Sequence, residues 1–285
     1  MSTIEIAADA INRARERPPV NPLNRRWTRF ILPAYTALMI LYLASPIFVM
    51  ILYGFNDVPG VRPSLTPRFW GFTLTWWKNV FNIQGLPEAF RNSLLIAPIS
   101  ATVATFLGTF FGLAIGRYRF RGLAVVDFVI FLAIAVPEIV LGSSLLSMFI
   151  LGGFPLGFNS ILLSHIGFSI AFVAITVRAR VQGLDRSLEE AAQDLFANPF
   201  MAFYKVTLPL ITPAIMAGFL LALVLSLDDF VISNFVAGQT STFPLWVYGV
   251  QRIGIPPQVN VMGTMLFGAG VITALVNVVV HRRKA

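Results

Sequence analysis

The sequence predicts an all-α integral membrane protein that crosses the bilayer six times. Apolar residues make up 56% of the 285 residues and charged residues only 12%, which is far from the composition of a soluble domain. A helix needs about twenty apolar residues to cross ~30 Å of hydrocarbon. Six stretches meet this requirement, at 31–53, 93–116, 124–150, 159–177, 210–235 and 259–280.

The basic residues predict how these spans are oriented. An even number of spans places both termini on one side of the membrane, and most of the 21 lysines and arginines lie in segments that this topology also places on that side. Because positively charged loops stay in the cytoplasm, we expect residues 1–30 to form a cytoplasmic tail and 31–285 the transmembrane domain. The tail has no apolar stretch before a cleavage site, so no removable signal peptide is expected. The net charge of +8 follows from this topology and does not indicate nucleic-acid binding.

Small residues recur at every fourth position of the stretch 93–116, namely Ala104, Gly108, Gly112 and Gly116. They share one helix face, and small side chains allow another helix to approach closely in lipid. We therefore expect this face to pack against a neighbouring helix.

Carboxylates inside the apolar stretches are the strongest functional signal. An aspartate at the centre of a span costs roughly 2.5–3.5 kcal/mol on insertion, and such acids usually face a cavity or a functional path. Asp228 and Asp229 lie in the fifth stretch, and Glu138 follows Pro137, which favours a kink, in the third. We expect these three acids to line one path, at middle to outer depth, that suits a cation.

Aromatic residues in the outer segment 236–258 support a cation as the ligand. Trp246 and Tyr248 are expected to add cation–π contacts to the charge pairing. The alternative is that Asp228 and Asp229 cap or brace a broken helix without touching a substrate.

Two other polar residues in the spans have structural interpretations. Asp127 lies near the inner end of the third stretch and is expected to pair with an arginine such as Arg121. His165 has no carboxylate nearby in the sequence and is expected to be a packing residue with satisfied hydrogen bonds. The sequence contains no cysteine and only two histidines, so disulfides are excluded and no metal site is expected.

The segment 185–209, on the predicted cytoplasmic side, is expected to form two short helices joined by a turn. Apolar residues recur at helical spacing from Leu188 to Leu195, and Asn198 followed by Pro199 is typical of a new helix start. Glu190 and Asp194 share a face at i, i+4, and the small Ala191 and Ala192 lie beside them, an arrangement that suits a basic, grooved partner. A solvated loop helix is the alternative.

The same segment resembles the EAA loop of permeases from bacterial ABC importers. The family pattern E-A-A, three residues, G, nine residues, I-x-L-P is matched in spacing by Glu190, Ala191 and Ala192, and later by Val206, Leu208 and Pro209. Phe196 stands where the family has glycine, so the angle between the two short helices is expected to differ. The stretches that resemble the spermidine/putrescine branch of these permeases are RYRFRG at 117–122, LLSHIGFSIAFVAITV at 162–177, SLDDFVISNFVAG at 226–238 and PPQVNVMGT at 256–264.

The resemblance implies a type I importer fold in the bacterial inner membrane, with import by alternating access. Its coupling helix, which rests on the ATPase, would comprise Glu190, Ala191 and Ala192, with Leu195, Phe196 and Pro209 as further coupling residues. The sequence has no G-x-x-x-x-G-K-[ST] phosphate loop, so we expect no enzyme activity and no cofactor in this chain. ATP and Mg²⁺ would bind to two ATPase subunits. A second related permease and an extracytoplasmic solute-binding protein are the other implied partners.

The rival hypothesis is an ion-coupled secondary carrier that uses the intramembrane acids as ion sites. The EAA spacing and the absence of a visible inverted repeat argue against it.

Overall fold

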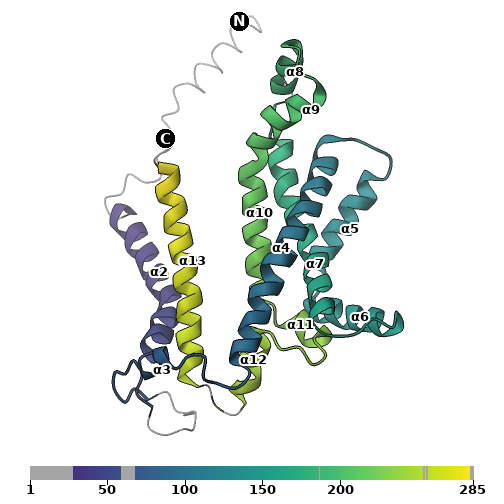
Figure 1. Ribbon diagram of the computed structural model, residues 1–285. Coiled ribbons are helices and arrows are strands. Elements are labelled where there is room, and N and C mark those ends of the chain that lie inside the picture. Colours follow the sequence, from purple (N-terminus) through teal and green to yellow (C-terminus); the bar gives the residue numbers. More distant parts are fainter. Residues whose placement is uncertain (1–27, 59–67, 186, 253, 255, 283–285) are drawn as a thin grey trace, which may run out of the picture. The chain divides into compact units, whose positions relative to one another are not determined.

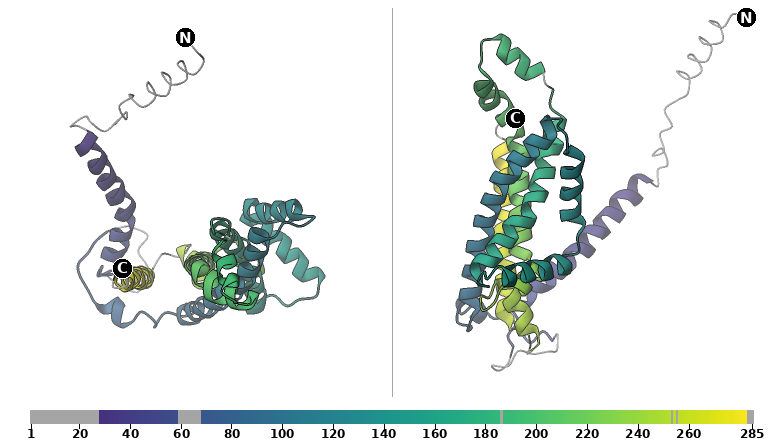
Figure 2. Two further views of the ribbon diagram at one scale, coloured as in Figure 1. Left: turned by 90° about the horizontal axis from the view of Figure 1, so that it is seen from above. Right: turned by 90° about the vertical axis from the view of Figure 1, so that its right-hand side faces the viewer.

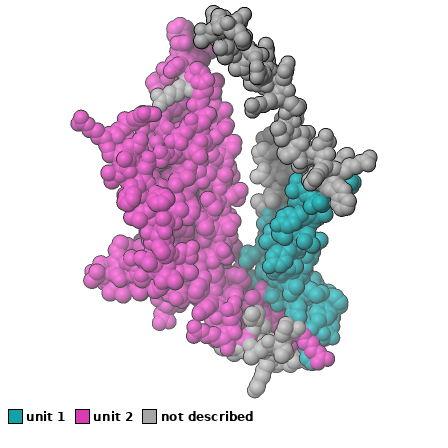
Figure 3. Space-filling view, turned by 180° about the vertical axis from the view of Figure 1, so that it is seen from behind, with its two compact units in different colours: residues 1–57, 69–77, 260–285 teal, residues 58–68, 78–259 magenta. Residues whose placement is uncertain are grey.

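The computed structural model describes residues 28–58, 68–185, 187–252, 254 and 256–282. Most of the predicted cytoplasmic tail therefore lies outside the described residues. The described chain is helical, and its one extended pairing is an isolated antiparallel bridge between Asn56 and Phe72. It divides into two compact units, coloured separately in Figure 3, of which one comprises 1–57, 69–77 and 260–285 and the other 58–68 and 78–259.

The first unit contains α2 (Thr28–Tyr53), α3 (Thr75–Lys78) and most of α13 (Pro257–Arg282). The chain just after the C-terminal end of α2 is attached to α3, because the Trp76 indole N–H donates to the Asn56 carbonyl at 2.7 Å. The rings of Phe55 and Trp77 stack with centroids 5.0 Å apart. An indole suits this position because it is apolar with one polar edge.

The second unit is built on three long helices, α4 (Leu86–Arg117), α7 (Phe158–Gln182) and α10 (Leu208–Asp228), which lie side by side (Figures 1 and 2). The predicted close packing of the small-residue face is confirmed. A Cβ added at Gly112 would lie 2.7 Å from the Ala174 carbonyl oxygen on α7, so only glycine permits this approach of the two backbones.

The predicted third span, 124–150, is not one helix. It forms α5 (Leu123–Ala135) and α6 (Glu138–Leu151), which meet at 105°. Pro137 offers no N–H to the preceding turn, and it holds Val136 in an extended conformation with ψ 130°. The helix must therefore stop, and α6 runs across the direction of the long helices (Figure 2).

The predicted fifth span, 210–235, is also interrupted. α10 ends at Asp228, Asp229 is extended with ψ 119°, and α11 covers Val231–Val236. α12 (Phe243–Gln251) follows. The two interrupted elements meet, because Gly142 of α6 lies against Phe235 of α11 with no room for a Cβ.

The number of spans agrees with the prediction only in part. Four helices in the described ranges are long and apolar enough to cross a membrane, and the bent α5–α6 pair counts as a fifth if it is one span. α13 has 26 residues and corresponds to the predicted sixth span.

The segment between α7 and α10 has the predicted form of two short helices and a turn. α8 (Ser187–Asp194) and α9 (Pro199–Ala202) are followed by a π-helical turn, η1 (Phe203–Thr207), which runs into α10 (Figure 1). The side chain of Asn198 accepts a hydrogen bond from the Met201 N–H at 2.7 Å, which confirms the predicted helix start.

Candidate functional site

A cavity of about 240 Å³ lies where the two helix interruptions meet. Residues on both sides of the α5–α6 bend and of the α10–α11 break line it, and Phe168 and Phe172 of α7 complete the wall. Its carboxylates are Glu138, Asp228 and Asp229. The structure thus brings the three acids singled out from the sequence to one cavity. Irregular backbone at membrane depth is tolerated where it lines such a space.

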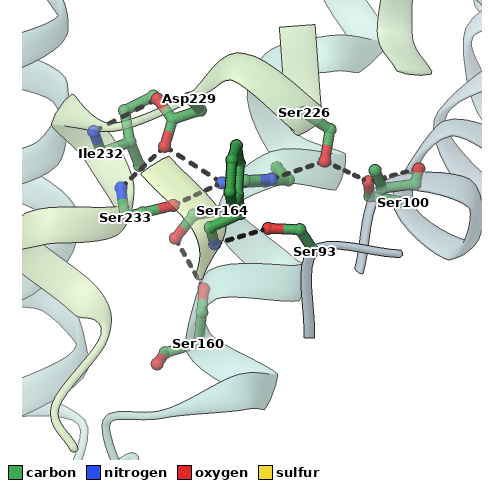
Figure 4. Close-up of polar contacts among 11 residues, drawn as sticks. Ser93, Ser100, Ser160, Ser164, Ser226, Asp229, Ile232 and Ser233 are labelled. Carbon is green, nitrogen blue, oxygen red and sulfur yellow. Dashed lines mark hydrogen bonds and ion pairs between the residues drawn. The ribbon is translucent and has the colours of Figure 1, made fainter. Parts of the chain in front are cut away.

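The two adjacent aspartates have different surroundings. Asp229 is almost buried, with 5% of its side chain exposed, and its carboxylate accepts hydrogen bonds from the backbone N–H groups of Ile232 at 3.3 Å and Ser233 at 2.8 Å. Figure 4 shows these bonds at the start of α11. Asp228, one residue earlier, is exposed. Asp229 therefore does brace a broken helix, which the sequence offered as the alternative, and it does so while lining the cavity.

His165 on α7 connects this brace to the long helices. Its Nε2 lies 3.1 Å from Asp229 Oδ2 and 3.0 Å from Ser233 Oγ, and its Nδ1 lies 2.7 Å from Ser226 Oγ. Ser226 in turn lies 2.9 Å from Ser100 Oγ on α4 (Figure 4). The expectation that His165 is a buried packing residue with satisfied hydrogen bonds is confirmed, but the sequence did not reveal its carboxylate partner. The partner is distant in the sequence, and only the packing of α10 on α7 brings the two together.

The two predicted aromatic residues lie on α12, and neither lines the cavity. The ring of Tyr248 is 4.4 Å from that of Phe230, which does line it, and the Arg252 guanidinium lies 5.3 Å from the Tyr248 centroid. The Trp246 indole donates to the Gln84 carbonyl at 3.2 Å, next to the start of α4. Tyr248 therefore adjoins the cavity through Phe230, whereas Trp246 fixes α12 to α4.

The segment between α7 and α10 presents an apolar surface to solvent. Leu195 is 81% exposed, Phe196 99% and Phe200 76%. Glu190 and Ala191 are exposed on α8, Ala192 is half-buried, and Pro209 is exposed at the start of α10. Exposed apolar side chains of this size, grouped on a short segment, are typical of a surface that docks a partner.

Glu189 is a residue that the sequence reasoning missed. Its carboxylate forms an ion pair with Arg117 at the end of α4 and accepts a hydrogen bond from the Thr207 hydroxyl at the end of η1. It therefore joins α8 to both α4 and the start of α10. The sequence gives a weak signal for this, because Glu189 and Glu190 lie on different sides of α8 and only one of them can face the bundle.

The backbone conformation of Phe196 explains why the family pattern has a glycine at this position. Its φ is +65°, in the left-handed region, and its N–H donates to the Gln193 carbonyl at 2.9 Å while the next N–H, of Ala197, returns to Ala192. This is the turn that commonly ends a helix with glycine. Phe196 thus keeps a conformation that glycine adopts freely, at a cost of roughly 1–2 kcal/mol.

Asp127 does not pair with Arg121. Its carboxylate forms a two-bond ion pair with Arg178 near the C-terminal end of α7, in which the second bond measures 3.1 Å. The expected pairing with an arginine is confirmed, but the partner is Arg178, because α5 packs along α7 and places this more distant arginine within reach.

Comparisons with known proteins identify the family. A sequence profile described as "Binding-protein-dependent transport system inner membrane component" matches residues 108–283. The spermidine/putrescine transport system permease protein PotC of Escherichia coli (strain K12) is 38% identical over 244 residues, which cover 85% of this chain and 90% of that protein. The putrescine transport system permease protein PotI of the same strain is 36% identical over 236 residues, covering 80% and 82%.

A solved structure shows the same fold. A bacterial ABC transporter involved in the import of the acidic polysaccharide alginate contains a chain with a TM-score of 0.64 and 16% identity, covering 90% of this chain and 97% of that one. The two chains thus share an overall fold, and the family profile covers more than half of this chain. The protein is a member of the family of binding-protein-dependent transport system inner membrane components.

Proposed function

We propose that this chain is the permease subunit of an ATP-driven importer that moves polyamines, spermidine or putrescine, or a similar cationic solute into the cytoplasm. The relatives named above are polyamine permeases, and the acidic cavity at the two helix interruptions suits such a cargo. The cavity is the observation that carries the proposal. It offers carboxylates to ammonium groups, and Phe168 and Phe172 offer apolar and π-face contact to the methylene stem and the charge.

ATP hydrolysis belongs to partner subunits in this proposal. Two ATPase subunits would bind ATP and Mg²⁺, and one would receive the exposed surface formed by Leu195, Phe196 and Phe200 beside Glu190, Ala191 and Ala192. Pro209 lies where this segment enters α10. A second permease would complete the path, and an extracytoplasmic binding protein would deliver the solute. Both termini would lie in the cytoplasm.

The connection from α8 through α10 to the cavity supports alternating access. Glu189 joins α8 to α4 and η1, so a displacement of α8 by the ATPase is passed to the start of α10. α10 has 21 residues and is therefore about 31 Å long at 1.5 Å per residue. Its far end carries Asp228, so the same rigid element that receives the movement also positions a carboxylate of the cavity.

Uptake of labelled spermidine and putrescine in the native cell tests the proposal. Three strains are compared: the intact strain, a deletion of this chain, and the deletion complemented with a double Asp228→Asn and Asp229→Asn variant. We expect uptake to be lost on deletion and to stay lost with the double variant at equal membrane abundance. Polyamine uptake that survives deletion would exclude the substrate assignment.

Reconstitution separates the proposal from an ion-coupled carrier. The purified chain alone in liposomes should not transport, whereas a secondary carrier would. Family membership already argues against the carrier.

A further inference from the structure

The two aspartates of the cavity differ in how many of their hydrogen-bonding positions are already used. Both oxygens of Asp229 are occupied, Oδ1 by the Ile232 N–H and Oδ2 by the Ser233 N–H and His165. Asp228 is exposed beside it and lines the same cavity. A carboxylate whose oxygens are already bonded gains less from an incoming ammonium group than one that exchanges water for it.

His165 is placed to hold this arrangement. Its side chain is 1% exposed, and it is bonded on both ring nitrogens. Because carboxylate oxygens accept hydrogen bonds, Nε2 carries the hydrogen that it donates to Asp229. Nδ1 is hydrogen-bonded to the hydroxyl of Ser226, in the last turn of α10. One rigid ring on α7 therefore fixes the chain on both sides of the interruption, at Ser226 and at Ser233.

We propose that His165 is a positioning residue for cation recognition: it holds Asp229 as a fixed brace of the α10–α11 break and thereby directs Asp228 into the cavity as the carboxylate that pairs with the solute. This division of roles rests on the proposed function for the identity of the cation. Glu138, which reaches the cavity from α6, is the second pairing acid and has no connection to His165 among the hydrogen bonds of the described residues.

Removal of the ring should therefore act through the brace. His165→Ala loses the donor to Asp229 and the partner of Ser226, whereas His165→Gln keeps an amide N–H that can replace Nε2. In the complete transporter, at equal membrane abundance, we expect His165→Ala to lower the maximal polyamine uptake about tenfold and His165→Gln to restore most of it. His165→Leu, which fills a similar volume without an N–H, should behave like His165→Ala, whereas a packing role alone would let leucine restore uptake as well as glutamine does.

Double variants show which residue His165 acts through. Adding Asp229→Asn to His165→Ala should cause little further loss, because both changes release the same brace. Adding Glu138→Gln should multiply the loss, because that acid reaches the cavity independently. Independent effects of His165 and Asp229 would overturn the proposal.

A chemical measurement tests the same inference whatever solute is carried. The native sequence has no cysteine, so Asp228→Cys introduces a single thiol at the position in question. We expect His165→Ala to change the rate at which a cationic methanethiosulfonate reagent labels this thiol at least about fivefold, and His165→Gln to leave the rate nearly unchanged. Gln239→Cys, exposed in the turn after α11, is the control and should label equally in all three backgrounds.

The outcomes separate the two claims. If deletion of the chain leaves polyamine uptake intact, the proposed function fails, while the labelling rates still decide whether His165 directs the side chain of residue 228. If adding His165→Ala to the Asp228→Cys variant leaves the labelling rate unchanged, the positioning role is overturned even when polyamine transport is demonstrated.

Discussion

At the scale of the residue, Phe196 has the backbone conformation expected of the glycine in the family pattern but carries a large side chain that glycine lacks. The backbone there adopts the left-handed conformation that glycine takes at no steric cost, yet the side chain is a fully exposed aromatic ring. The chain accepts a strained turn and gains an exposed apolar group at the tip of the segment between α7 and α10. The departure from the pattern therefore changes the exposed surface of this segment more than it changes the fold of the turn.

Replacing Phe196 distinguishes the ring from the backbone. Phe196→Ala removes the ring and keeps the strain, whereas Phe196→Gly removes both. If the ring docks on the ATPase, both variants should weaken co-purification of the ATPase subunits by about 1–3 kcal/mol, which is the value of a buried aromatic side chain. Phe196→Gly should in addition raise the free energy of unfolding of the detergent-solubilised chain by about 1 kcal/mol. Full retention of the ATPase by both variants would show that the ring is not part of the interface.

At the scale of the element, the two interruptions were predictable to different degrees. Pro137 carries a local physical signal, because proline lacks the donor that a continuing helix needs, and the kink was expected although its size was not. No proline or glycine lies at the break after Asp228, so the sequence gives no local signal for it. It arises because Asp229 finds partners in His165 and Ser233, and such contacts depend on helix packing that one sequence does not encode locally.

The difference between local signals and contacts made by helix packing also explains which partners of site residues the sequence did not reveal. The cap at Asn198 and the small residues facing α7 follow from neighbours three or four positions apart, and the sequence predicted both. The partners of Asp127 and His165 lie on other helices, so sequence proximity pointed to Arg121 for one and to no carboxylate for the other. Which of Glu189 and Glu190 faces the bundle depends on the rotation of α8 about its axis, and the tertiary fold sets this rotation.

Pro137 provides a test at this scale. Pro137→Ala restores the missing N–H and lets α5 continue toward α6, which would carry Glu138 away from the cavity. We expect uptake of labelled spermidine to fall about tenfold at unchanged membrane abundance, since one charge-assisted contact is lost. Pro98→Ala is the matched control, because Pro98 lies exposed inside α4, which continues through it. An equal effect of the two substitutions would mean that the bend does not position Glu138.

At the scale of the whole molecule, the proposed coupling to an ATPase would require both docking of α8 and transmission from it. In this proposal the exposed Glu190 would serve docking and the adjacent, bundle-facing Glu189 would serve transmission. Docking is an intermolecular contact, whereas transmission is an internal connection from α8 to Arg117 and Thr207. A loss of transport alone cannot distinguish them, because either failure leaves the cavity without ATP-driven movement.

Charge reversal at one position and neutralisation at the other separate the two tasks. Glu190→Lys should insert normally but abolish the stimulation of ATP hydrolysis by loaded binding protein, because the partner surface that accepts the acid would repel a lysine. Glu189→Gln should retain the ATPase on purification and yet reduce the stimulated rate about tenfold, because a neutral amide replaces a partly buried ion pair with Arg117. If Glu189→Gln instead released the ATPase while Glu190→Lys retained it, the two assignments would have to be exchanged, and α8 would dock through the face that packs on the bundle in this structure.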